Sequence, residues 1–242
     1  MATLYPTTGT TLFNLNLNDL VEEAFERCGK ELRSGYDMRT ARRSLNILTI
    51  EWANRGLNLW TIDSGSIPLT YNVGTYALPV DTIDLLDHVT RTGSGVTQSD
   101  INITRISEST YATIPNKNAT GRPIQVWIQR LSGALGPDLT VTPPQITVWP
   151  LPDPSNSYTF VYWRLRRIQD AGNGINGQDI PFRFIPPMVA GLAYYLSIKL
   201  PDVDFNRISM LKSDYEEQYQ LAAEEDREKA AVRFVPRESF LR

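Results

Sequence analysis

Residues 37 to 64 constrain the fold of this chain most, because a helical pattern is followed there directly by a β pattern. Asp37 is expected to cap the helix, and Gly56 is expected to end it. Residues 59 to 62 then have the composition of a short strand. Five apolar side chains recur every three or four residues, the spacing of one helix face: Met38, Ala41, Leu45, Leu48 and Trp52. The chain is therefore predicted to pass at this point from a helical part into a β-rich part.

Opposite charges gather on two of the expected helices. The helix after Asp37 carries four arginines against two acids: Arg39, Arg42, Arg43 and Arg55 against Asp37 and Glu51. Residues 202 to 231, read as a long last helix capped by Asp202 or Asp204, hold nine acids against four basic residues. We therefore predict that the acidic last helix lies near the basic second helix, within one chain or between neighbouring copies.

Composition excludes several classes of site. Cys28 is the only cysteine and His88 the only histidine among 242 residues, which rules out an internal disulfide and a thiolate zinc cluster and leaves little room for a nucleophile-base pair. Both are expected to be ordinary structural side chains. The chain shows no secretion signal at its start and no run of the ~20 apolar residues that a membrane span needs. The protein is expected to be soluble and cytoplasmic when made.

Periodicity predicts an α+β fold in which helices at both ends enclose a β-rich middle. A first helix is expected after a capping box formed by Asp19 and Glu22, and a further helix is expected from residue 184. Strands are expected around residues 83–91, 124–129, 145–149 and 158–165, with one or two helical turns at 105–115. Both faces of the strand at 158–165 are apolar, which predicts cover on two sides, by the chain's own layers or by a neighbouring subunit.

No motif points to catalysis. Gly172, Gly174 and Gly177 have the spacing of a dinucleotide-binding loop, but no helix and no βαβ unit are predicted to follow, so a loop is expected instead. No catalytic, cofactor or metal residues are predicted, and the chain is expected not to be an enzyme. Two alternatives stay open: a hydrolase using a pair of carboxylates, and a carbohydrate-binding β module using Trp127 or Trp163.

The C-terminal eleven residues alternate basic and apolar side chains. They are too few to form a core of their own, and such a segment commonly becomes ordered on a partner. The alternative is a frayed terminus. We expect this tail to be a binding segment.

Six stretches of the sequence resemble a known protein family when they are taken together and in order, although none of them is specific by itself. They are LNILTIEWANRGLNLWTID, YALPVDTIDLL, IPNKNATGRP, VWPLPD, DIPFRFIPPMVAGLAYYLSIK and EEDREKAAVRFVP. Together they resemble the head-to-tail adaptor proteins of short-tailed bacteriophages, also called tail tubular protein A. The likeness runs from about residue 19 to residue 236, and it covers the N-terminal arm and the last six residues least.

The resemblance implies a structural protein of the virion, located at the head-tail junction and assembled in the host cytoplasm. It implies a homo-oligomeric ring, with twelve copies expected, between the portal protein and the tail nozzle protein. Double-stranded DNA would pass through the lumen without sequence-specific binding, and no cofactor or membrane partner is implied. Some relatives of this class have been credited with cell-wall degradation, so a virion-associated peptidoglycan hydrolase is the alternative function.

The same resemblance divides the chain into four parts. Residues 1–58 would form an N-terminal arm and two helices of a helical body, and residues 59–183 a β-rich domain facing the tail. Residues 184–231 would supply the C-terminal helices of the body, and residues 232–242 an extension that binds the portal. Five residues are expected at the portal contact: Arg233, Phe234, Val235, Pro236 and Arg237.

Overall fold

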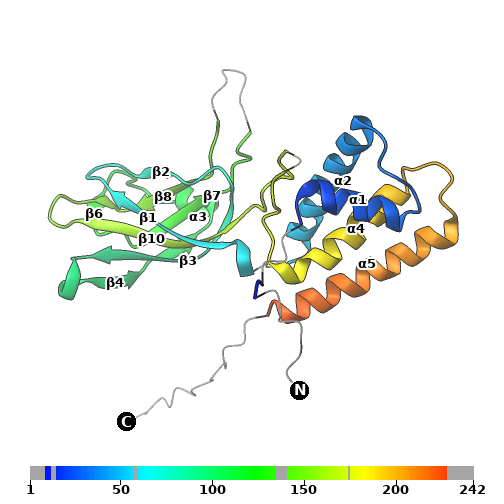
Figure 1. Ribbon diagram of the computed structural model, residues 1–242. Coiled ribbons are helices and arrows are strands. Elements are labelled where there is room, and N and C mark those ends of the chain that lie inside the picture. Colours follow the sequence, from blue (N-terminus) through cyan, green and yellow to red (C-terminus); the bar gives the residue numbers. More distant parts are fainter. Residues whose placement is uncertain (1–8, 12–14, 57–58, 135–140, 174, 228–242) are drawn as a thin grey trace, which may run out of the picture. The chain divides into compact units, whose positions relative to one another are not determined.

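The structure is a computed structural model that describes residues 9–11, 15–56, 59–134, 141–173 and 175–227 (Figure 1). The chain divides into two compact units, one made of Met1–Thr49 with Asp170–Arg242 and the other of Ile50–Gln169. Helices and several sheets are both present, which confirms the expected mixture of α and β structure.

Four helices make up most of the first unit, although the last residues of the second of them belong to the other unit. They are α1 (Leu17–Arg27), α2 (Gly35–Arg55), α4 (Ile185–Ser197) and α5 (Phe205–Glu225), with the 3-10 turn η3 (Phe182–Phe184) before α4. The most apolar of them is α4, and it packs against both α1 and α5. Burial of its side chains, together with Leu20, Phe25 and Leu45, forms the core of this unit.

The helix starts depend on polar side chains that accept backbone N–H groups. Asn16, not the predicted Asp19, caps α1, because its Oδ1 accepts the Asp19 N–H at 2.9 Å. For α2 the predicted cap Asp37 lies inside the first turn. Its Oδ2 accepts the Ser34 N–H at 3.1 Å, while the Ser34 Oγ accepts the Asp37 N–H at 3.3 Å. This reciprocal pair starts α2 earlier than predicted.

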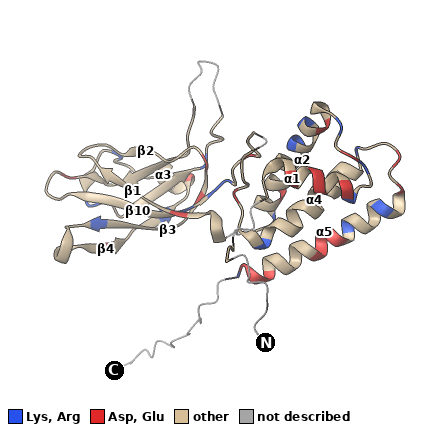
Figure 2. Cartoon of the chain, viewed as in Figure 1, with Lys and Arg blue, Asp and Glu red and all other residues tan. Residues whose placement is uncertain are grey.

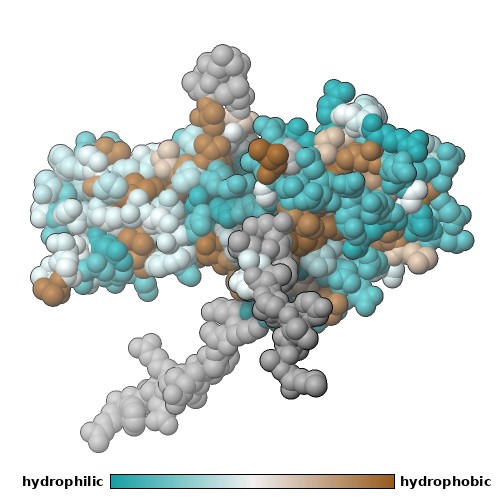
Figure 3. Space-filling view, viewed as in Figure 1, coloured by the Kyte–Doolittle hydropathy of each residue, from teal (hydrophilic) through white to brown (hydrophobic). Residues whose placement is uncertain are grey.

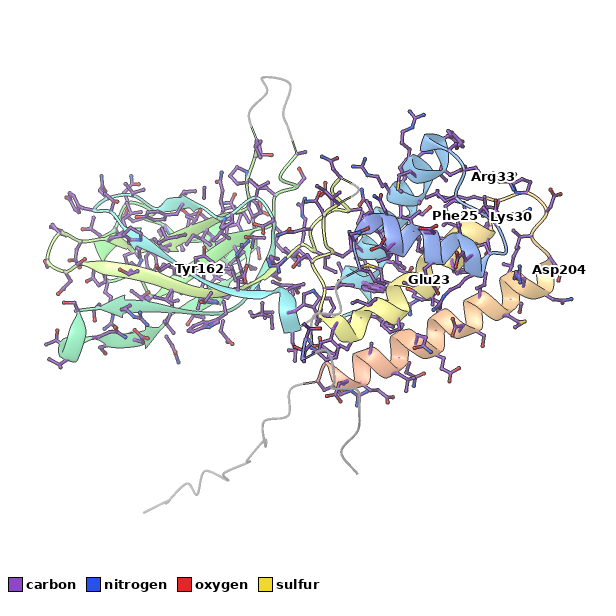
Figure 4. All side chains as sticks on the ribbon, viewed as in Figure 1. Glu23, Phe25, Lys30, Arg33, Tyr162 and Asp204 are labelled. Carbon is purple, nitrogen blue, oxygen red and sulfur yellow. The ribbon has the colours of Figure 1, made fainter. Side chains whose placement is uncertain are left out.

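Gly191 marks the closest packing in the helical unit. A Cβ at this position would lie 2.8 Å from the Tyr215 ring and 2.9 Å from the Leu48 side chain, both of which are buried. Only a residue without a side chain lets α2 and α5 approach α4 at one point. The predicted cap Asp204 is observed at the start of α5, where it accepts the Asn206 N–H at 3.0 Å (Figure 4).

Two four-stranded sheets form the second unit, with strand orders β1-β10-β3-β4 and β2-β8-β7-β5. The strands of the first are β1 (Ile62–Leu69), β10 (Tyr158–Arg166), β3 (Thr82–Thr92) and β4 (Ser99–Asn102). Those of the second are β2 (Thr75–Ala77), β8 (Gln145–Trp149), β7 (Gln125–Gln129) and β5 (Thr104–Ile106). A short pair, β6 (Thr120–Gly121) with β9 (Leu151–Pro152), the helix α3 (Glu108–Ala112) and the turns η1 (Leu59–Thr61) and η2 (Gly95–Thr97) complete the unit.

One apolar core lies between the two sheets. Phe160 and Tyr162 of β10 meet Val126 of β7 and Ile146 of β8 in a single buried cluster (Tyr162 is labelled in Figure 4). The strand expected at 124–129 is observed as β7, in which Val126 and Ile128 are buried and alternate with partly exposed neighbours, whereas Ile124 before it is exposed. The unit is therefore a sandwich of two mainly antiparallel sheets.

Two local predictions differ from the structure. The expected strand at 59–62 begins as the 3-10 turn η1, and β1 starts only at Ile62. The expected helix at 105–115 is shortened to α3, because β5 takes its first residues into parallel pairing with β7. The outer face of β10 is partly covered within the chain, since Val161 is buried while Trp163 is 38% exposed, and cover by a neighbouring subunit stays a prediction.

Residues 170–177, expected with the β-rich part, hydrogen-bond to the helical unit. The Ala171 N–H donates to the Asn46 side chain at 2.9 Å, and the Leu17 N–H donates to the Asn176 carbonyl at 3.2 Å. This segment contains the glycines with dinucleotide-type spacing. Its described residues form irregular loop structure, and Gly172 adopts a φ of 53°. It is the loop that the sequence predicted.

Candidate interaction surfaces

The five residues expected at the portal contact, Arg233 to Arg237, lie outside the described residues. Within the described residues, no group of three or more His, Cys, Asp or Glu side chains is placed to hold a metal ion. None of the described helices is both long and apolar enough to cross a bilayer.

Cys28 lies in the core at the end of α1. Its Sγ donates to the Ala193 carbonyl of α4 at 3.2 Å. Burial raises the pKa of the thiol to about 11, although the nearby Arg207 acts in the opposite direction. The thiolate needed for nucleophilic attack is therefore scarce at neutral pH, and the group acts as a small packing residue.

His88 lies on β3 with its ring 5.9 Å from that of Phe160. Burial lowers the pKa of His88 below 6.5, and Arg105 lowers it further, against smaller opposite effects of Asp87, Asp84 and the Ile103 backbone. Its Nδ1 is buried and has no hydrogen-bond partner in the described part of the chain. The ring is therefore held neutral, as a packing group of the sandwich.

The two tryptophans considered for glycan binding have different surroundings. Trp127 stacks on Tyr111 with ring centroids 5.1 Å apart, and Lys117 Nζ lies 5.6 Å from the Tyr111 ring centroid. One face of Trp127 is therefore already occupied. Trp163 is the more accessible of the two.

The outer face of α2 is the clearest candidate surface. Tyr36, Arg39, Arg42, Arg43 and Asn46 line a hollow of about 390 Å³. Arg42 donates to the Asn173 side chain at 3.4 Å, and Arg43 donates to Thr40 Oγ1 at 3.3 Å. Among the described residues, no carboxylate lies within ion-pair distance of Arg39, Arg42 or Arg43. Three positive charges therefore stay uncompensated at close range.

Asp214, one of the acids of α5, has a partner within the helical unit. Asp214 is paired with Arg27 of α1 at 3.4 Å, and Arg27 also binds Glu23 at 2.9 Å. Figure 2 shows acidic residues along α5, and basic residues near the start of α2. Arg55, the fourth arginine of α2, is paired with Glu51 on its own helix at 2.5 Å. In the described part of the chain, α2 and α5 are therefore not joined by an ion pair between Arg39, Arg42 or Arg43 and an acid of α5.

Sequence reasoning found the arginines of α2 but missed the apolar side chains beside them. Tyr36 and Ile47 are 64% and 49% exposed, on the same side of the helix as Arg43. Their spacing was visible in the sequence. The buried stripe of the same helix was the stronger signal, so these two positions were not singled out.

No protein-family model matches the chain, and no curated protein matches it.

Proposed function

We propose that this chain is a structural adaptor subunit, one of a ring of identical copies that joins the portal of a short-tailed phage to the tail nozzle. The observation that carries the proposal is the ordered set of segments resembling such adaptors, from about residue 19 to residue 236. In this proposal the N- and C-terminal helices form a helical body, and the β-rich middle is an insertion that faces the tail.

The surface of α2 supports a role in assembly. Its arginines lack carboxylate partners among the described residues, and apolar side chains are exposed beside them. Charged groups beside apolar ones are typical of surfaces that bind another protein. The proposed function needs no catalytic group. Cys28 is a buried, protonated thiol and His88 is a buried, neutral imidazole. Neither side chain provides a nucleophile or belongs to a cluster of metal ligands among the described residues.

The mechanism we propose is mechanical and electrostatic. The ring completes the packaged head and provides part of the channel through which double-stranded DNA leaves. Acidic side chains lining the bore would repel phosphates, so the DNA would slide without binding. Portal attachment is assigned to the basic and apolar C-terminal segment around Arg233 to Arg237.

The test compares two truncations in a binding assay with purified portal protein. A chain ending at Val232 should keep its circular dichroism spectrum and lose attachment to the portal. A chain ending at Arg237 is the matched control, and it should attach normally. Normal attachment of the shorter chain would refute the assignment of the tail. Clearing of peptidoglycan that depends on one pair of carboxylates would favour the hydrolase instead.

A further inference from the structure

A solvent-exposed stripe on α2 combines apolar and basic residues. Tyr36, Arg39, Arg43 and Ile47 follow one another at intervals of three or four residues, which places them on one helix face. All four are exposed. We call them the α2 stripe. Tyrosine and arginine are among the residues enriched at protein interfaces, so the composition of this face fits a binding surface.

A groove lies next to the α2 stripe. It has a volume of about 610 Å³, and Tyr36, Arg43 and Ile47 form part of its wall. Phe25 of α1 and Leu196 of α4 contribute apolar surface, and residues 199–201 complete the far side. The groove is thus largely apolar, and its charged lining residues are two basic ones, Arg43 and Lys199, and one acid, Asp37. Such a site fits an amphipathic helix whose exposed face carries both apolar and acidic side chains.

The outward face of α5 has that composition. Met210, Glu217, Leu221 and Glu224 recur at intervals of seven, four and three residues, which also places them on one helix face. Met210 and Leu221 are 72% and 57% exposed. We call these residues the α5 stripe. Figure 3 shows hydrophobic surface scattered among hydrophilic surface over the helices of this unit.

The two stripes match in charge and in apolar content, but among the described residues they are not paired with each other. Both stay exposed, and Asp214 of α5 pairs with Arg27 of α1 and not with the α2 stripe. Each stripe is therefore available to the opposite stripe of another molecule.

We propose that the α5 stripe of one copy docks on the α2 stripe and its adjoining groove in a second copy. This inference deepens the proposed function and rests on it, because it names the surfaces through which copies in the ring meet. The two stripes lie on different helices, so the contact is heterologous. Each copy then has one donor and one acceptor surface, and repetition closes into a ring when the rotation between copies allows it.

Charge reversal tests the contact on the full-length chain. Arg39→Glu with Arg43→Glu should weaken self-association by roughly tenfold or more, measured by sedimentation velocity across a concentration series. Adding Glu217→Arg and Glu224→Arg to the same chain should restore association, because the charges are again opposite. Association of the wild type should also weaken as salt is added.

A double variant of equal charge change, Lys117→Glu with Arg122→Glu, is the control, since both residues are exposed and lie in the β unit. It should associate like the wild type. Circular dichroism of every variant separates misfolding from lost contact. Unchanged association of the Arg39 and Arg43 double variant would overturn the inference, as would failure of the fourfold variant to recover while it remains folded.

A wild-type chain that stays monomeric at every concentration would also overturn the proposed contact. The proposed function is decided separately, by attachment to the portal protein. Loss of portal attachment without loss of self-association in the α2 double variant would assign the stripe to the portal and not to a second copy.

Discussion

His88 illustrates how the sandwich holds a titratable group in its neutral form. The pKa of its imidazole is lowered in the folded state, chiefly by burial, so the unfolded chain binds the proton more readily. Stability from this group is present above pH 6.5, the ordinary value, and is lost as the pH falls through 6.5 toward the folded pKa. One side chain thus makes the β unit sensitive to mild acid.

We expect the free energy of unfolding to fall as the pH drops below 6.5, by at most about 1.4 kcal/mol per pH unit. His88→Gln should flatten this slope, because glutamine does not titrate. Urea unfolding at a series of pH values measures it. The lowered pKa of Asp81, where pairing with Arg164 outweighs burial, acts only at lower pH, as the pH falls through 3.8. An equally steep slope in the variant would contradict the account of His88.

Cys28 should be almost inert in the native protein. The thiol has a pKa of about 11, and its Sγ donates a hydrogen bond to the Ala193 carbonyl. It is therefore protonated and shielded from solvent at neutral pH. A thiol-specific reagent should therefore label the folded chain at least about a hundredfold more slowly than the chain in denaturant. Rapid labelling under native conditions would show that α1 opens readily from α4.

At the scale of single elements, the helical unit depends on the absence of a side chain on α4. Gly191→Ala would place a methyl group within 3 Å of Tyr215 and Leu48, both buried. The clash, typically about 1 to 3 kcal/mol, should outweigh the gain of up to about 1 kcal/mol in helix propensity. The variant should be less stable by roughly 1 kcal/mol in thermal or urea unfolding.

Gly35→Ala is the matched control for that substitution. Gly35 is also helical, at the start of α2, and an added Cβ there meets nothing within 4 Å. This variant should be as stable as the wild type or slightly more so. If both variants were equally stable, the close approach at Gly191 would not limit the packing of α4.

At the scale of the whole molecule, the two units can be followed by different signals. All five tryptophans lie in Ile50–Gln169, so their fluorescence reports on the unit that contains the sandwich. Helical circular dichroism reports mainly on the other unit, where most of the helical residues lie. Two units with separate cores give no reason to expect a single two-state transition.

Phe160→Ala should distinguish the two transitions. Phe160 is fully buried in the sandwich core, and its truncation should cost about 3 to 5 kcal/mol in that unit. The fluorescence transition should move to lower denaturant, and the helical transition should move less. Equal shifts in both signals would mean that the chain unfolds as one cooperative body.

Much of the secondary structure could be predicted because the sequence signals for helices and strands are local. The alternation at Val126 and Ile128, the apolar run of α4 and the cap at Asp204 each depend on residues a few positions apart. Propensity and periodicity act over that range, so they identify an element before its partners are known. The mixture of helices and strands was visible for the same reason.

The amino-acid sequence alone determined which segments become helix or strand, which charges they carry and that Cys28 and His88 could form no cluster with a second residue of their kind. Only the tertiary structure decided which partners these side chains meet. It joined Ala171 to Asn46 of α2, paired Asp214 with Arg27, and left Arg39 and Arg43 without a carboxylate among the described residues. The physical reason is that ion pairs and packing depend on distances in space, whereas the sequence records only spacing along the chain.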